Sequence, residues 1–157
     1  MLSLLIGGNK VNSEVKDMDV HALEMIELEL AILIRRTTSI SNNKKFGNLD
    51  RSAYLILRRI KEKGAAGVKV LAEEFKLDIS TVSRQAAALE QKDYLYRIPD
   101  PLDGRAYSLQ LTEQGTKELS DYKQERLKRI TELLEDWSDE ERKLFGVLLE
   151  KFNRAFN

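Results

Sequence analysis

The sequence predicts an α+β fold, mainly α, in which a winged helix-turn-helix is flanked by N- and C-terminal helices. Residues 71–115 read LAEEFKLDISTVSRQAAALEQKDYLYRIPDPLDGRAYSLQLTEQG, the pattern of helix, turn, helix, strand, loop, strand and helix start. Both prolines of the chain, Pro99 and Pro101, lie in the loop between the two strands. On either side of this stretch, apolar residues recur at the three- and four-residue spacing of amphipathic helices.

The N-terminal third contains two predicted helices. Residues 19–40 have apolar positions on more than one helical face, so this helix needs more than one packing partner. Residues 41–49, rich in Asn and Lys with one Gly, predict a loop. A second helix is expected from Asp50, a suitable N-cap, to Lys63, with Gly64 as its stop. The residues of this helix expected to face inward are Tyr54, Leu55, Leu57 and Ile60.

A helix-turn-helix follows, with a third helix over residues 69–75 and a fourth over residues 80–92. A small residue in the third helix allows the fourth to approach closely, and apolar residues are expected to bury the turn and anchor the fourth helix. These predicted packing residues are Ala72, Leu77, Ile79, Val82 and Leu89.

The second half of the chain predicts a hairpin and two long helices. Residues 94–98 and 106–111 are strand candidates, and Asp103-Gly104 supplies the turn chemistry between them. Residue 112 opens a fifth helix to about residue 134. The S-x-x-E spacing of Ser138 and Glu141 predicts a capping box for a sixth helix to about residue 156.

The exposed start of the fourth helix carries side chains suited to reading DNA. Arginine can grip guanine, glutamine can pair with adenine, and hydroxyl groups can serve bases or phosphates. The alternative is that these residues are ordinary capping and surface groups, which the hydroxyls would fit. The candidate major-groove residues are Ser80, Thr81, Ser83, Arg84 and Gln85.

The hairpin offers a second DNA contact. Arg105 follows the turn and could enter a narrow minor groove, with Asp103 orienting its guanidinium; the alternative is a surface ion pair of little energy. Arg97, on the other strand, suits phosphate better than bases. Lys69 and Ser52 are weaker phosphate candidates.

Composition excludes several other classes of protein. The chain has 42% apolar residues, no cysteine and no run near the roughly 18 apolar residues of a membrane span, so a cytoplasmic protein with no membrane contact is expected. Net charge is zero, but residues 35–63 carry nine basic residues against Asp50 and Glu62. No glycine-rich phosphate loop, catalytic set or metal-ligand cluster is present, and His21 is the only histidine, so neither an enzyme nor a cofactor is expected.

The stretch from residue 71 to residue 115 resembles the MarR family of winged-helix transcriptional regulators. The matching motifs are LAEEF, STVSR, LEQK, DPLDGR and LTEQG, and the resemblance in element order covers residues 20–156. The wing followed by L-T-E-x-G is the specific part. The chain departs from the family at Asp93, where glycine is usual, and at Ala86, Ala87 and Ala88, which leave the fourth helix poor in base-reading side chains.

The resemblance implies a single chain with two functional parts. Residues 50–112 would form the DNA-binding winged helix-turn-helix, and residues 19–49 and 113–157 the dimerisation helices. The expected partners are double-stranded DNA, a second copy of the chain, and a small aromatic or anionic effector. The expected function is sequence-specific transcriptional regulation, as a repressor on a pseudo-palindromic operator. The alternative is a winged helix that contacts another protein without binding DNA.

Overall fold

The computed structural model describes residues 19–43 and 49–156, with side chains in the first range described up to residue 37. The chain forms two compact units. The described part of the first unit is helix α2 (Val20–Asn43). Residues 41–43, predicted to be loop, are therefore helical, because Ser and Asn weaken a helix near its end without stopping it. The rest of the predicted loop lies outside the described residues.

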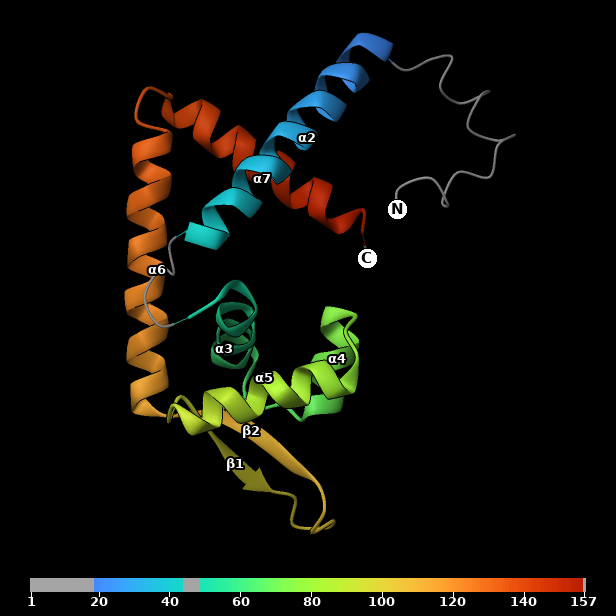
Figure 1. Cartoon of the computed structure of the whole chain (residues 1–157), viewed down its shortest axis with the longest axis vertical. Helices are drawn as coiled ribbons and strands as arrows, with labels where there is room; N and C mark the ends of the chain where they lie inside the picture. The colour runs from blue at the N-terminus through green and yellow to red at the C-terminus, as the bar shows by residue number, and fades with distance from the viewer. Residues whose placement is uncertain (1–18, 44–48, 157) are drawn as a thin grey trace, which may run out of the picture. The chain divides into compact units, whose positions relative to one another are not determined.

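The second unit contains the helix-turn-helix, the hairpin and the two C-terminal helices in the predicted order (Figure 1). Each boundary lies within two residues of its prediction. The elements are α3 (Arg51–Lys63), α4 (Val68–Phe75), α5 (Ile79–Gln91), β1 (Leu95–Pro99), β2 (Tyr107–Leu111), α6 (Glu113–Leu133) and α7 (Asp139–Arg154).

The helix caps predicted from sequence are confirmed. Asp50 caps α3 by accepting a 2.8 Å hydrogen bond from the backbone N–H of Ala53. Gly64 ends the same helix with a φ of +85°, in the left-handed region that glycine adopts at little cost. Ser138 and Glu141 form the reciprocal capping box at the start of α7.

One apolar core joins α3, α4, α5, the hairpin and the start of α6. The prediction for α3 was wrong at Leu55, which is 44% exposed, while Ile56 is buried. The inward stripe of α3 runs through Ala53, Ile56, Leu57 and Ile60, at helical spacing, and position 55 lies beside it.

The turn between α4 and α5 also differs from its prediction. Leu77 and Ile79, expected to be buried, are both exposed. The turn is closed by the backbone instead, since Lys76 adopts a left-handed conformation and the N–H of Leu77 donates to the carbonyl of Ala72. Ala72 itself is buried with Val82 and Leu89, as predicted.

Strands β1 and β2 form a two-stranded antiparallel hairpin, the wing, in which Leu95 pairs with Leu111 and Pro99 with Tyr107. Leu109 also pairs with Ala66, just before α4, through two backbone hydrogen bonds. Apolar packing holds the wing mainly through its base, where Leu95 and Leu109 are buried, and through Tyr107 of β2, which packs against the core; the rest of β1 is exposed.

Helix α6 starts against the segment that links α5 to the wing. The hydroxyl of Thr112 accepts from the N–H of Gly115 and donates to the carbonyl of Asp93. A Cβ at Gly115 would lie 2.0 Å from the carbonyl oxygen of Tyr94, so no side chain fits there. Asp93 has a φ of +59°, the left-handed conformation that glycine adopts at least cost.

Helix α7 buries none of its residues, although its sequence is amphipathic. Its exposed apolar residues form a stripe with those near the end of α6 and in the connection between them. These residues are Leu127, Ile130, Leu133, Trp137, Leu144, Phe145, Val147, Leu148, Leu149, Phe152 and Phe156. No helix within the described ranges has the length and apolar character needed to cross a membrane.

Candidate nucleic-acid interface

Helix α5 has one buried face and one outward face. Val82, Ala86 and Leu89 pack into the core. At about 100° per residue, the opposite face carries Ser80, Arg84, Ala87 and Gln91, and all four are exposed. The outward face therefore combines two polar side chains and an arginine around a bare alanine.

Two of the predicted major-groove residues, Ser80 and Arg84, lie on this outward face. Arg84 forms no ion pair or hydrogen bond with any residue that the structure describes. The N-cap residue Asp78 makes no side-chain bond to the first turn of α5, so no side chain of the cap competes for the amides there. The fold makes no use of the Arg84 guanidinium, which leaves it available to a partner.

The other three predicted residues, Thr81, Ser83 and Gln85, are only half exposed. Gln85 lies on the core side of α5, because it is three residues after Val82 and four before Leu89. Its amide oxygen is buried and has no hydrogen-bond partner among the residues that the structure describes. In this conformation Gln85 faces α3, and a base could reach its amide only after the side chain turns outward.

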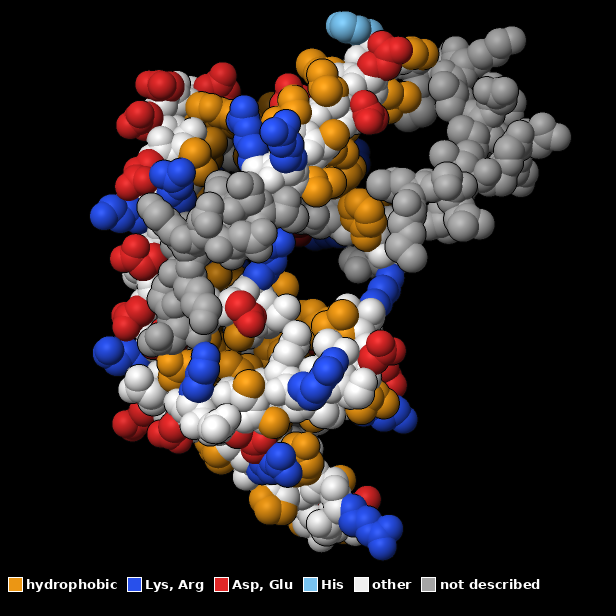
Figure 2. All heavy atoms as spheres, in the orientation of Figure 1, with side chains coloured by type: hydrophobic (Ala, Val, Ile, Leu, Met, Phe, Trp, Pro, Cys, Tyr) orange, Lys and Arg blue, Asp and Glu red, His pale blue; other side chains and the backbone are white. Residues whose placement is uncertain are grey.

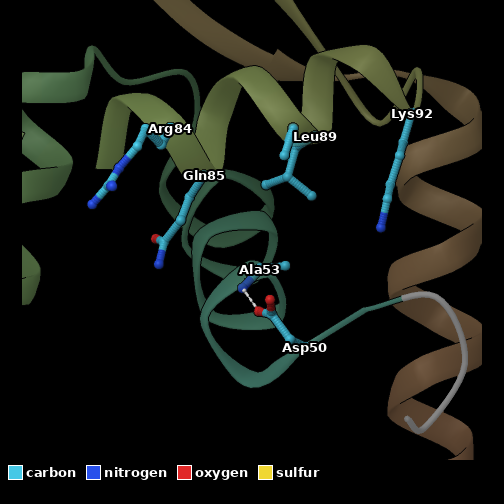
Figure 3. Close-up of a pocket in the computed structure, with 7 residues that line it drawn as sticks. Asp50, Ala53, Arg84, Gln85, Leu89 and Lys92 are labelled. Atoms are coloured by element: carbon cyan, nitrogen blue, oxygen red, sulfur yellow. Dashed lines mark hydrogen bonds between the residues drawn. The ribbon is translucent and has the colours of Figure 1, made fainter. Parts of the chain in front are cut away.

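Gln85 lines an open groove of about 220 Å³ between α5 and the start of α3. Figure 3 shows Arg84 and Lys92 at the two ends of this groove, with the Asp50 cap on the α3 side. The groove is lined by Asp50, Ala53, Arg84, Gln85, Ala88, Leu89 and Lys92.

Gln91 is a candidate DNA-binding residue that was not predicted from the sequence. It lies at the C-terminal end of α5, two turns beyond Arg84 on the same exposed face. The i, i+4, i+7, i+11 spacing of Ser80, Arg84, Ala87 and Gln91 was the signal that could have identified it.

The loop of the wing is shaped by two aspartates. Asp100 accepts from the N–H groups of Leu102 and Asp103, and Asp103 accepts a 2.9 Å bond from the N–H of Arg105. Asp103 was expected to hold the Arg105 guanidinium, but its carboxylate binds the backbone N–H of Arg105 instead. Asp103 fixes the backbone of the turn, and the Arg105 side chain forms no ion pair with the described residues. Leu102, at the tip, is 96% exposed.

Arg97 is already occupied by the protein itself. Its Nε lies 2.6 Å from one carboxylate oxygen of Glu90 and its terminal nitrogen 3.0 Å from the other. Its guanidinium carbon lies 4.2 Å from the centre of the Tyr107 ring. The hydrogen bonds that Arg97 donates to Glu90 raise the pKa of Arg97 above its usual value. The predicted phosphate contact would have to compete with this carboxylate.

The weaker phosphate candidates both lie in the first turn of a helix. Lys69 is exposed near the start of α4, and Ser52 is half buried near the start of α3. Both positions suit a phosphate approaching a helix N-terminus.

The basic stretch at residues 35–63 is partly neutralised within the fold. Arg58 pairs with Glu62 at 2.7 Å, and Arg59 forms a two-pronged ion pair with Glu74 at 2.6 and 2.8 Å. Figure 2 shows basic colour at the far end of the wing, while acidic and basic side chains alternate along α6. On the face that Figure 2 shows, the positive charge of the described residues therefore lies at separate points.

Comparison with known proteins gives a consistent result. The MarR family model matches residues 49–107. The chain is 50% identical over 135 residues to the "uncharacterized HTH-type transcriptional regulator YxaD" of Bacillus subtilis (strain 168), covering 85% of this chain and 94% of the relative. A MarR family protein from Bacillus stearothermophilus is similar in structure, with a TM-score of 0.69 at 22% identity over 88% of this chain and 98% of that one. The PcaV transcriptional regulator from Streptomyces coelicolor, solved in complex with its natural ligand, has a TM-score of 0.58 at 17% identity over 91% of this chain and 96% of that one.

Proposed function

Because the chain belongs to the MarR family and is an HTH-type transcriptional regulator, we propose that it is a homodimeric repressor of a pseudo-palindromic operator. Two α5 helices would enter successive major grooves, with half-sites centred about 10 bp apart. The two wings would enter the flanking minor grooves.

The proposal is carried by the contrast among three arginines. Arg84 on α5 and Arg105 on the wing form no ion pair among the described residues, whereas Arg97 is held by Glu90. An exposed arginine that the fold does not use is suited to a partner with acceptor atoms, and guanine offers two in the major groove. Figure 1 shows α5 and the wing at the same end of the second unit, so both can approach one duplex.

We assign the major-groove surface to Ser80, Arg84 and Gln91, with Thr81 and Ser83 at its edge. Gln85 would join them only after its side chain leaves the groove beside α3. In the minor groove, Arg105 would make the contact and Asp103 would hold the loop that presents it. Lys69 and Ser52 would bind phosphates.

Homodimer formation is supported by the apolar stripe of α7 and the end of α6. These exposed side chains are far more contiguous than single apolar residues scattered on a monomer surface. A second copy of the chain has the complementary stripe, so a two-fold interface would cover both. The dimerisation part would then comprise residues 19–49 and 113–157, as the sequence predicts.

Release by a small aromatic or anionic effector is the remaining part of the proposal. Where α3 meets α6, the rings of Tyr54 and Tyr122 lie 5.0 Å apart and Arg126 stacks over both. Ring faces beside a guanidinium suit an aromatic carboxylate. Small aromatic acids titrated against the DNA complex should release it and raise the melting temperature of the free protein; no change in either would remove the effector from the proposal.

The central test is Arg84→Ala on DNA selected from a random pool with the wild-type protein. If Arg84 grips a base, the variant should lose about 1–3 kcal/mol on the selected site and much less on scrambled DNA. Arg129→Ala, an exposed arginine on α6, is the matched control and should bind as the wild type does.

Equal losses on both DNAs would reassign Arg84 to phosphate. Failure of the wild-type protein to enrich any sequence would favour the alternative, a winged helix that contacts proteins.

A further inference from the structure

We propose that Glu90 is a positioning residue for DNA binding, which sets the angle of the wing through Arg97. This inference rests on the proposed function, because it concerns how α5 and the wing reach one duplex together. In this proposal Glu90 does not contact DNA. It acts through the Arg97 guanidinium that it binds.

The three residues involved come from three different elements. Glu90 lies in the last turn of α5, Arg97 in the middle of β1 and Tyr107 at the start of β2. Both carboxylate oxygens of Glu90 accept hydrogen bonds from Arg97, and Arg97 stacks on the Tyr107 ring. We call these residues the wing clamp. It ties the end of α5 to both strands of the wing.

Apart from the clamp and the packing of Tyr107 against the core, little holds the outer half of the wing. Leu95 and Leu109 anchor its base in the core, while the side chains of β1 from Tyr96 onward are exposed. A two-stranded hairpin has marginal stability of its own in water and can pivot about its base. A two-pronged bond to a planar guanidinium restrains direction as well as distance. The clamp is therefore placed where it can restrain such a pivot.

A stacked, paired arginine differs from a free one in energy. The Glu90 side chain is only about one-fifth exposed, so its carboxylate is partly desolvated. Removing Arg97 from the carboxylate to serve a phosphate would leave Glu90 without its cation. The bonds that raise the pKa of Arg97 thus also favour its staying in the clamp.

The proposal and plain electrostatics make opposite predictions for Glu90→Gln. Losing a negative charge close to DNA should tighten binding, because repulsion of the phosphates falls. Losing the clamp should weaken it, because Arg105 would no longer be held over the minor groove. A freed Arg97 acting on phosphate would add to the tightening and steepen the salt dependence.

The experiment compares wild type, Glu90→Gln, Arg97→Lys and Glu73→Gln on the selected DNA over a salt titration. Glu73 is an exposed carboxylate on α4, outside the wing clamp, and controls for the lost charge. We expect Glu90→Gln to bind the selected DNA about tenfold more weakly, equal to roughly 1.4 kcal/mol. In footprinting, the flanking minor grooves should lose their protection by the protein, as they would with Arg105→Ala. Arg97→Lys, which keeps the charge without the planar fork, should lose protection in part.

A second readout requires no DNA. The chain has no cysteine, so Leu102→Cys accepts a single probe at the tip of the wing. Glu90→Gln should increase the mobility of this probe in the free protein, with the melting temperature of the protein unchanged. A purely structural role of Glu90 would lower the melting temperature instead.

Equal or tighter DNA binding by Glu90→Gln, with unchanged probe mobility, would overturn the proposal and return Arg97 to phosphate binding. If Glu90→Gln does not fold, Arg97→Lys carries the same test, and retained full protection would overturn the proposal. Failure of the wild type to bind any DNA is a different result, because the probe measurement would still report on the clamp.

Discussion

Leu57 in α3 is fully buried, whereas Leu148 in α7 is 51% exposed, although both occupy the apolar side of an amphipathic helix. The difference between these two leucines extends to the regions around them. The winged helix-turn-helix closes a core together with the first half of α6, within one chain. Helix α7 also has an apolar stripe and buries none of it. One region is thus complete within a single chain, and the other is suited to a partner surface.

Leu57→Ala should give the largest effect, a lower free energy of unfolding of the winged helix-turn-helix core. Removal of a fully buried leucine side chain typically costs about 2–5 kcal/mol, since it leaves a cavity in addition to the lost burial. Urea unfolding followed by circular dichroism would measure this loss. Leu55→Ala, on the exposed side of the same helix, is the matched control and should cost far less. Equal losses would mean that the core of the DNA-binding region is wrongly placed.

Leu148→Asp should weaken the association of two chains through α7. In a two-fold dimer the change occurs twice, and each lost leucine burial removes about 1.5–3 kcal/mol from the association. Sedimentation should show a shift toward monomer, while the melting of the winged helix-turn-helix core should change little. Lys143→Asp places the same side chain on the opposite side of α7 and should leave association intact. If Leu148→Asp stays as associated as the wild type, this stripe is not the dimer interface.

Glu74→Gln should lower the free energy of unfolding by the smallest amount, and only above acidic pH. The hydrogen bonds from Arg59 lower the pKa of Glu74, so its ion pair stabilises the folded state above the pKa of an unfolded glutamate. That contribution is lost as pH falls through the lowered folded pKa. A pair with this exposure is worth about 0.2–1 kcal/mol.

The measurement is the stability difference between wild type and Glu74→Gln across a pH series. It should be present near neutrality and shrink toward zero in acid. Glu150→Gln removes a pair confined to α7 and should show no comparable trend in the stability of the core. A Glu74→Gln difference that grows in acid would contradict the assigned role of the ion pair.

Much of the candidate interface follows from sequence, because the wing motif and helix patterns are local. D-P-L-D-G-R placed Arg105 past the turn, and the apolar spacing of Val82 and Leu89 marked the buried side of α5. The run of polar residues predicted to read DNA does not coincide with the outward face of α5. It includes Gln85, which faces α3, and omits Gln91, which shares the outward face of Arg84. A consecutive run was taken as one face, whereas a helix turns about 100° at each residue.

What the sequence determined by itself is the order of the elements, their caps and the identity of the wing. Asp50 and Ser138 cap their helices through bonds to residues three positions away, and such bonds depend only on nearby residues. The tertiary structure alone decided that Arg97 is held by Glu90 and that Gly115 must lack a side chain against Tyr94. These contacts join residues from different elements, and their geometry exists only once the core has brought α5, the wing and α6 together.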